Sequence, residues 1–251
     1  MTQTAIAPTY SIVSKRVQLA CAGCVPVGMV TFIAGFFIAG YIPPPPAYDT
    51  PQQIAEFYRH DTNTVRFGLL LALIGFAVWG PLIAVITRQM LRIKPRHNVL
   101  AYVQLGSGVA AWQFLLVPVL LLTTAAFRPE RSPEITQALH DLGWIFLFMP
   151  FTPFVVQSLS IALAALLDFG PRPVFARWVG YLNLLEFVLF LPVGLLTFFK
   201  TGPFAYHGIL VFWVPLAVFC VWLLVMSWAS YRAVLDEYAQ LPASGQEANG
   251  A

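Results

Sequence analysis

The chain has 251 residues, of which 59% are hydrophobic and only 10% charged, and its mean hydropathy is +0.74. A single water-soluble core cannot bury this many apolar side chains. The composition therefore predicts an all-α protein embedded in lipid. The formal net charge of +3 is no larger than membrane insertion normally leaves on a polytopic protein, so it gives no argument for a nucleic-acid partner.

Six apolar stretches reach the length of ~20 residues that a helix needs to cross ~30 Å of hydrocarbon. They are residues 18–41, 67–87, 100–127, 142–167, 178–199 and 208–228. The basic pair Lys15-Arg16 resembles the start of a signal peptide, but the apolar run 17–42 exceeds the ~7–15 residues of a cleavable segment, so we interpret it as a retained span. The expected organisation is a cytoplasmic segment 1–16, a six-helix domain 17–232 and a polar, disordered tail 233–251.

A repeated motif indicates how the six spans are arranged. Residues 50–61 read Thr-Pro-Gln-Gln-Ile-Ala-Glu-Phe-Tyr-Arg-His-Asp, a shorter copy occupies 132–141, and a degenerate copy occupies 202–208. Each copy precedes an apolar run and places a histidine at its start. This pattern predicts three helical hairpins whose histidine-bearing tips lie on one side of the membrane.

The first copy of the motif also predicts a short helix between the first two spans. Thr50 is a favourable N-cap and Pro51 suits the first helical position. Ile54, Phe57 and Tyr58 share one face, which we expect to lie on the lipid headgroups as an interfacial helix.

The distribution of basic residues predicts the orientation, since cytoplasmic loops carry the excess of Lys and Arg. Of the 14 basic residues, nine flank the spans on the side of the termini and five on the side of the repeat. The nine are Lys15, Arg16, Arg88, Arg92, Lys94, Arg96, Arg172, Arg177 and Arg232, and the five are Arg59, Arg66, Arg128, Arg131 and Lys200. We therefore expect both termini in the cytoplasm; the resemblance described below implies that the membrane is the bacterial cytoplasmic membrane.

Glu186 is the only formally charged residue well inside a predicted span, which makes it a functional candidate. Asn183 shares its helix face, and Gln157 and Gln104 are expected at a similar depth, so the four side chains could form one polar layer. A neutral Glu186 hydrogen-bonded to Gln157 or Gln104 would hold helices together, while the alternative roles are a proton relay or a ligand anchor.

The histidines of the repeat suggest a second candidate site. His60, His140 and His207 would lie near the starts of three spans, with Asp61 and Asp141 as further ligands or orienting partners for a transition metal. The alternative is that these residues start helices at the interface and bond to water and headgroups. No other cofactor is predicted, because the chain has no Walker A, GxSxG, HExxH or dinucleotide-binding motif.

Two further features concern packing. The pair Cys21 and Cys24 has the CxxC spacing but no second ligand pair, so we interpret both as small packing residues. Pro150 and Pro153 are expected to kink the fourth span. The phenylalanines around them suggest an apolar cavity: Phe146, Phe148, Phe151 and Phe154.

Three stretches of the chain resemble those of a group of bacterial six-span membrane proteins without an assigned activity. They are residues 127–136 (Phe-Arg-Pro-Glu-Arg-Ser-Pro-Glu-Ile-Thr), 177–183 (Arg-Trp-Val-Gly-Tyr-Leu-Asn) and 199–204 (Phe-Lys-Thr-Gly-Pro-Phe). The resemblance implies a six-span topology and says nothing about chemistry.

The preferred hypothesis is a non-enzymatic membrane protein that binds or transports an apolar or amphipathic small molecule or lipid, or serves as an accessory subunit for one. A metal-dependent membrane enzyme that uses the outer histidines is the first alternative. A structural subunit that docks another membrane protein is the second.

Overall fold

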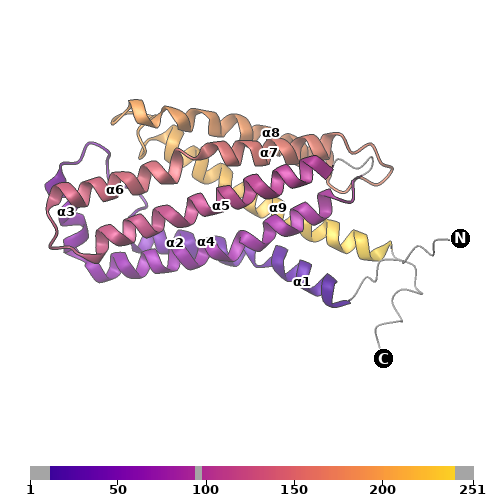
Figure 1. Cartoon of the computed structure of the whole chain (residues 1–251), viewed down its shortest axis with the longest axis horizontal. Helices are drawn as coiled ribbons and strands as arrows, with labels where there is room; N and C mark the ends of the chain where they lie inside the picture. The colour runs from indigo at the N-terminus through magenta and orange to yellow at the C-terminus, as the bar shows by residue number, and fades with distance from the viewer. Residues whose placement is uncertain (1–11, 94–97, 241–251) are drawn as a thin grey trace, which may run out of the picture.

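The computed structural model describes residues 12–93 and 98–240, and within these ranges the chain is helical without any β-strand. Figure 1 shows a long bundle in which the long helices run roughly along one axis. The α-helices are α1 (Ile12–Gly23), α2 (Val25–Ile38), α3 (Pro51–His60), α4 (Thr62–Met90), α5 (Asn98–Phe127), α6 (Pro133–Phe148), α7 (Phe151–Leu166), α8 (Arg177–Phe190) and α9 (Val214–Ala239). The 3-10 segment η1 (Leu191–Phe198) follows α8, and the π-helical turn η2 (Ile209–Trp213) precedes α9.

Within residues 12–93 and 98–240, six helical segments are long and apolar enough to span a membrane, as the hydropathy pattern predicted. They are Ser14–Ile38, Thr62–Met90, Val99–Phe127, Pro133–Leu166, Arg177–Phe198 and Ile209–Ala239. Length and composition are therefore those of a multi-pass membrane protein.

Proline residues interrupt two of the spans. The first span breaks at Cys24, since Pro26 stands in the first turn of α2 and lacks the N–H that would continue the helical ladder. The fourth span breaks between α6 and α7, where Pro150 occupies the N-cap position. The kink predicted in the fourth span is thus confirmed.

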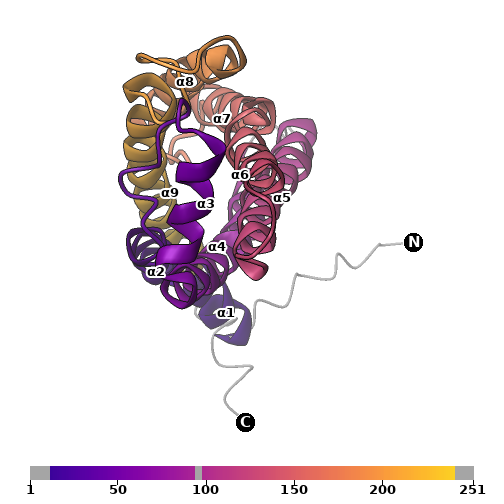
Figure 2. The ribbon, with the colours of Figure 1, turned by 90° about the vertical axis from the view of Figure 1, so that its left-hand side faces the viewer.

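The spans close into a ring, which Figure 2 shows end-on. Helix α4 packs mainly against α2 and α5, α7 packs against α5 and α8, and α9 fills the space between α8 and the two helices of the first span. Helix α1 begins and α9 ends at the right-hand end of the bundle in Figure 1, whereas α3 and the start of α6 lie at the opposite end. We call these the terminal end and the α3 end.

The closest helix contact is between α2 and α4, where glycines let the two backbones touch. A Cβ atom added at Gly75 would lie 2.4 Å from the backbone nitrogen of Phe32, and one added at Gly35 would lie 2.4 Å from that of Ala72. Small residues at such positions are typical of helix association in membranes, because close approach increases van der Waals contact.

Helix α3 is present as predicted, with Thr50 and Gln53 forming a capping box and Pro51 in the first turn. Its expected position on lipid headgroups is wrong, because Ile54 is 2% exposed and Tyr58 fully buried. The helix lies across the end of the ring and packs chiefly on α6 (Figure 2). Its apolar face is covered by protein, so it closes the α3 end of the bundle.

Helix α9 extends eleven residues beyond the span expected at 208–228, to Ala239. The cause is a buried polar network, in which Glu237 accepts from Arg88 Nη2 at 2.7 Å and from Gln89 Nε2 at 3.1 Å. Arg92 Nε lies 3.6 Å from the same carboxylate. The part of the expected disordered tail up to Ala239 is therefore helical, and residues 241–251 lie outside the described residues.

Candidate functional site

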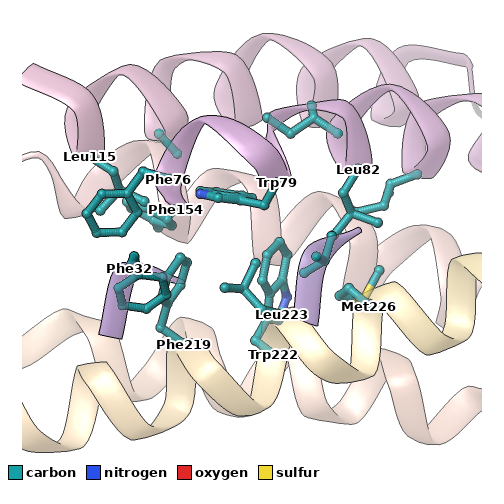
Figure 3. Packing of buried hydrophobic residues seen from close by; sticks show 14 of the residues in the cluster. Phe32, Phe76, Trp79, Leu82, Leu115, Phe154, Phe219, Trp222, Leu223 and Met226 are labelled. Atoms are coloured by element: carbon teal, nitrogen blue, oxygen red, sulfur yellow. The ribbon is translucent and has the colours of Figure 1, made fainter. Parts of the chain in front are cut away.

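The bundle contains a cavity of about 70 Å³ whose lining side chains are all apolar and mostly aromatic. Phenylalanines from five spans line it, together with leucine, valine and proline side chains. Figure 3 shows Phe32, Phe76, Phe154 and Phe219 of this lining. The phenylalanines are Phe32, Phe36, Phe76, Phe148, Phe151, Phe154, Phe190, Phe212 and Phe219. Phe148, Phe151 and Phe154 belong to the group that the sequence suggested around the prolines, whereas Phe146 is not among the lining residues.

Three irregular helix segments border this cavity. The break between α6 and α7 contributes Phe148 and Phe151, the segment η1 contributes Val193, and the turn η2 contributes Phe212. Side chains from these segments also form a small cluster of their own around Val193 and Val211. π-Helical turns occur often at functional sites, because they break the regular ladder and re-aim side chains.

On the side of the terminal end, the cavity wall passes into a buried polar layer. Phe154 of α7 stacks on Phe190 of α8 with ring centroids 5.7 Å apart. One helical turn further toward the terminal end, Ser158 Oγ lies 2.5 Å from Glu186 Oε2. Glu186 is 2% exposed, so its carboxyl group is buried. It lies one helical turn from Phe190, which lines the cavity.

The contacts of Ser158 bear on the protonation of Glu186. The Ser158 hydroxyl has one proton, and its oxygen lies 2.8 Å from the Phe154 carbonyl as well as 2.5 Å from Glu186 Oε2. The hydroxyl can donate fully to only one of these two oxygens, whereas a protonated Glu186 could itself donate to Ser158. Both contacts are satisfied together only when Glu186 is neutral, which also avoids the cost of several kcal/mol for an unpaired charge in lipid.

Two tryptophans lie beside the cavity, each one helical turn from a cavity phenylalanine in the direction of the terminal end. Trp79 follows Phe76 on α4, and Trp222 follows Phe219 on α9. Trp222 Nε1 donates to Asn183 Oδ1 at 2.9 Å, and its ring centroid is 6.5 Å from that of Trp79. The Trp79 indole is 1% exposed, and its Nε1 has no hydrogen-bond partner among the described residues. In Figure 3 the nitrogen end of this indole faces Phe76 and Phe154.

The four side chains of the predicted polar layer are all buried, but they do not form one network. Glu186 is bonded to Ser158 instead of the expected Gln157 or Gln104. Gln104 accepts from Thr87 at 2.6 Å, and Asn183 accepts from Trp222. Both amide atoms of Gln157 are buried without a partner in the described part of the chain, as is Glu186 Oε1.

On the side of the α3 end, the cavity is bounded by Trp144 and a chain of hydrogen bonds. Trp144 stacks on Phe148, with ring centroids 6.1 Å apart, and donates through Nε1 to His140 Nε2 at 2.9 Å. The other ring nitrogen of His140, Nδ1, lies 2.9 Å from the Tyr58 hydroxyl, which also accepts from Tyr41 at 2.9 Å.

This chain fixes the tautomer of His140. An indole nitrogen can only donate, so Nε2 of His140 must accept, and the proton of the neutral ring is on Nδ1, which donates to Tyr58. Both nitrogens are therefore engaged within the protein. The pKa values of the Tyr58 and Tyr41 hydroxyls are raised well above their ordinary range, chiefly by burial, so both phenols stay protonated.

The predicted metal site does not form from the residues that the structure describes. His140 is fully buried and bonded at both nitrogens, whereas His60 is exposed at the end of α3. Asp61 caps α4 by accepting from the Thr64 amide at 3.3 Å, and its hydrogen bonds to Thr64 lower its pKa. Among the described residues, no group of three or more His, Cys, Asp and Glu side chains could hold a metal ion, so the expected set of His60, His140, His207, Asp61 and Asp141 is not a metal site.

His207 has a structural contact of its own, in which Nδ1 accepts from the Ala47 amide at 2.9 Å. Its ring also meets Tyr48 edge-on, with centroids 5.5 Å apart. Burial lowers the pKa of His207, and the neighbouring Asp49 partly opposes that shift. His207 therefore fastens the loop after the first span in its neutral form.

Several residues of the site were not found from the sequence. Ser158, Trp79 and Trp222 carried no motif, and only their placement one turn from Phe154, Phe76 and Phe219 identifies them. Tyr58 was identified as part of an apolar face, while its hydroxyl proved to be the partner of His140. Helical spacing on the printed sequence could have placed Ser158 beside Phe154, but not opposite Glu186.

Comparisons of the chain with protein-family models, with curated proteins and with solved structures found no match.

Proposed function

We propose that this protein binds an apolar or amphipathic small molecule in the phenylalanine-lined cavity, as a binding, transport or accessory component of a bacterial cytoplasmic membrane. The observation that carries the proposal is the cavity itself, because nine phenylalanines line a space of about 70 Å³. Close packing is the rule inside proteins, so an apolar space that remains between interdigitated rings is a natural binding site.

The surroundings of the cavity support a specific role. Its walls include three irregular helix segments, and such segments can rearrange with less loss of hydrogen bonding than a regular helix. Helix α3 covers one end of the bundle, and the Glu186–Ser158 pair lies at the other side of the cavity. A ligand in this space would contact only aromatic and aliphatic side chains.

The experiment compares a variant that fills the cavity with one that adds the same volume outside it. Leu216→Phe places a larger side chain in the cavity wall, and Leu224→Phe makes the same change on the exposed side of α9. The probe is 4-fluorotoluene, titrated into protein in lipid nanodiscs and followed by ¹⁹F NMR against empty nanodiscs. We expect saturable binding in the wild type and Leu224→Phe, and at least a tenfold loss in Leu216→Phe.

Binding that is absent from the wild type, or equal in both variants, would refute a cavity site and leave a structural subunit as the better hypothesis. The proposal would also fail if the probe signal in protein-containing nanodiscs matched that of empty ones. Thermal unfolding of both variants shows whether each is folded under the conditions of the titration.

The proposed orientation places the terminal end in the cytoplasm and the α3 end outside, on the basis of the Lys and Arg distribution. Ser132 and Arg172 are exposed at opposite ends and provide the test. A membrane-impermeant thiol reagent applied outside intact cells should label Ser132→Cys and spare Arg172→Cys. The reverse labelling pattern would show that the orientation is inverted.

A further inference from the structure

A second cavity, of about 680 Å³, lies at the terminal end of the bundle and shares no lining residue with the phenylalanine cavity. The end of α4, the loop between α7 and α8 and the residue that follows α9 enclose it. In Figure 1 this loop and the end of α9 both lie at the right-hand end. One water molecule needs ~10–15 Å³, so the space has room for a ligand group of many heavy atoms. The charged residues of the lining are Arg88, Arg92, Arg172 and Asp168.

The three arginines differ in what they already bind. Arg88 donates through Nη2 to Glu237 at 2.7 Å, and Arg92 Nε lies 3.6 Å from the same carboxylate. Arg172 is exposed and has no hydrogen-bond or ion-pair partner among the described residues. The carboxylates of Asp168 and Glu237 offset two of the three positive charges, so a positive excess remains at the cavity.

The loop that carries Arg172 is held by the carboxylate of Asp168, which is 6% exposed. Its Oδ1 accepts from the Gly170 amide at 3.2 Å, and its Oδ2 accepts from the Val174 amide at 2.8 Å. Both carboxylate oxygens are therefore engaged within the loop. Arg172 lies between the two anchored amides, so the loop presents this arginine at the cavity without pairing it.

We propose that this cavity binds a phosphate group, with the guanidinium groups of Arg172 and Arg88 as its principal donors. Arg88 uses only Nη2 for Glu237, so its Nε and Nη1 have no partner in the described part of the chain. A guanidinium group binds phosphate oxygens through a planar fork of N–H groups, and a tetrahedral phosphate can receive such forks from two directions. A carboxylate has only two oxygens, and one fork already satisfies them.

The position of the cavity fits a phosphate at a membrane surface. Arg172 lies between the span that ends at Leu166 and the span that begins at Arg177. In the proposed orientation this surface is the cytoplasmic one, where basic pockets between spans bind anionic lipid headgroups. A soluble phosphorylated molecule offers the same oxygens from the water side. The positive excess disfavours a cation, and a neutral molecule gains nothing from it.

The test compares pairs of molecules that differ in the phosphate. Phosphatidic acid and diacylglycerol with the same acyl chains are titrated into the full-length protein in neutral detergent, and bound molecules are counted by native mass spectrometry. Glycerol 3-phosphate and glycerate are titrated by isothermal calorimetry at constant ionic strength. We expect at least one phosphorylated probe to bind about tenfold or more tightly than its counterpart.

The variants assign this preference to the cavity. Arg172→Gln removes a charge that has no described partner, so it should fold as the wild type does and bind the phosphorylated probe about fivefold or more weakly. Gln240→Glu adds a negative charge to the lining and should weaken binding to a similar degree. Asp236 lines an adjacent cavity of about 370 Å³ that also contains Arg172, so Asp236→Asn should keep or strengthen binding.

The matched control is Arg232→Gln. Arg232 is an exposed arginine in the last third of α9 that lines neither cavity of the terminal end, and its replacement should leave binding within about twofold of the wild type. The control and Arg172→Gln change the net charge equally, so a difference between them belongs to the cavity.

Binding of phosphatidic acid alone would assign the phosphate to a lipid, and comparable binding of glycerol 3-phosphate would assign it to a soluble molecule; both results support the site. No preference for either phosphorylated probe would overturn it. So would equal binding in Arg172→Gln and Arg232→Gln, because affinity would then follow net charge. The 4-fluorotoluene titration is independent of these outcomes, so failure of this site leaves the phenylalanine cavity untouched.

Discussion

Glu186 and Ser158 are hydrogen-bonded across the interface of α7 and α8, with 2.5 Å between Oε2 and Oγ, while the same Ser158 oxygen lies 2.8 Å from the carbonyl of Phe154. The pair is asymmetric, because Ser158 keeps a partner when Glu186 is removed and Glu186 keeps none when Ser158 is removed. This asymmetry separates a role in folding from a role in binding.

Replacement of Glu186 by leucine should change the free energy of unfolding by no more than about 1 kcal/mol. The change removes a buried oxygen that has no partner and leaves Ser158 bonded to Phe154. Ser158→Ala should cost more, about 1–3 kcal/mol, because both carboxyl oxygens of Glu186 then lack a partner. Equilibrium unfolding in a mixed micelle measures both variants, and a larger loss in Glu186→Leu than in Ser158→Ala would contradict the protonation argument.

Glu237, a second buried carboxyl group, should behave differently. It joins α9 to α4 through Arg88 and Gln89, so Glu237→Leu leaves several donors without their acceptor. We expect a loss of about 1–3 kcal/mol in unfolding free energy, which is moderate since Arg88 reaches solvent. The neighbouring Asp236 is exposed, and Asp236→Asn is the control that should stay within about 0.5 kcal/mol of the wild type.

The contact between α2 and α4 should not tolerate a side chain at Gly75. An alanine Cβ would meet the backbone nitrogen of Phe32 at 2.4 Å, so the helices must separate, at a cost of about 1–3 kcal/mol. At Gly106 on α5, an added Cβ meets no atom within 4 Å. Gly106→Ala should therefore be neutral or stabilising by up to ~1 kcal/mol. Equal effects of the two substitutions in thermal unfolding would show that the interface is looser than described.

Tyr58→Phe should loosen the covering helix α3. The substitution removes the hydroxyl that accepts from His140 and Tyr41, and it leaves two buried donors unpaired. Amide hydrogen exchange over residues 51–60 should become faster by about tenfold or more, since ~1.4 kcal/mol corresponds to a factor of ten. Tyr48→Phe alters an exposed tyrosine and is the control. Unchanged protection in Tyr58→Phe would mean that apolar packing alone holds α3.

Acidification should release the loop that His207 fastens. Burial lowers the pKa of His207 in the folded loop. As the pH is lowered, the unfolded loop therefore binds a proton at a higher pH than the folded loop does, and the folded loop loses stability. This stabilisation is complete above the unfolded value of ~6.5 and declines as the pH falls from there toward the lower folded pKa. A proton on Nδ1 also displaces the Ala47 amide.

The readout for this loop is the protection factor of peptides that contain Ala47, measured between pH 7.5 and 5.5 and corrected for intrinsic exchange. We expect it to fall with pH in the wild type and to be low and nearly constant in His207→Leu. Constant protection in the wild type would show that His207 stays neutral or that the contact contributes little.

The number of spans, the α3 helix with its cap and the break at Pro150 were predictable from the sequence, because these features depend on local properties. Hydropathy over ~20 residues, the Thr50–Gln53 capping pair and the missing N–H of proline act within one or two helical turns. It also identified Glu186, since a carboxyl group within an apolar run is visible without a structure.

Which side chains meet was not predictable from the sequence, because it depends on how the helices pack. The expected partners of Glu186 were chosen by depth along the helix, but contact also requires the rotation of each helix about its axis, and that is set by packing such as the approach of Gly35 and Gly75. The three histidines have the same place in the repeat, yet His140 points into the bundle, His60 is exposed and His207 binds a loop. The cavity likewise exists only because five spans bring phenylalanines to one level, where interlocking rings leave a space that no single helix encodes.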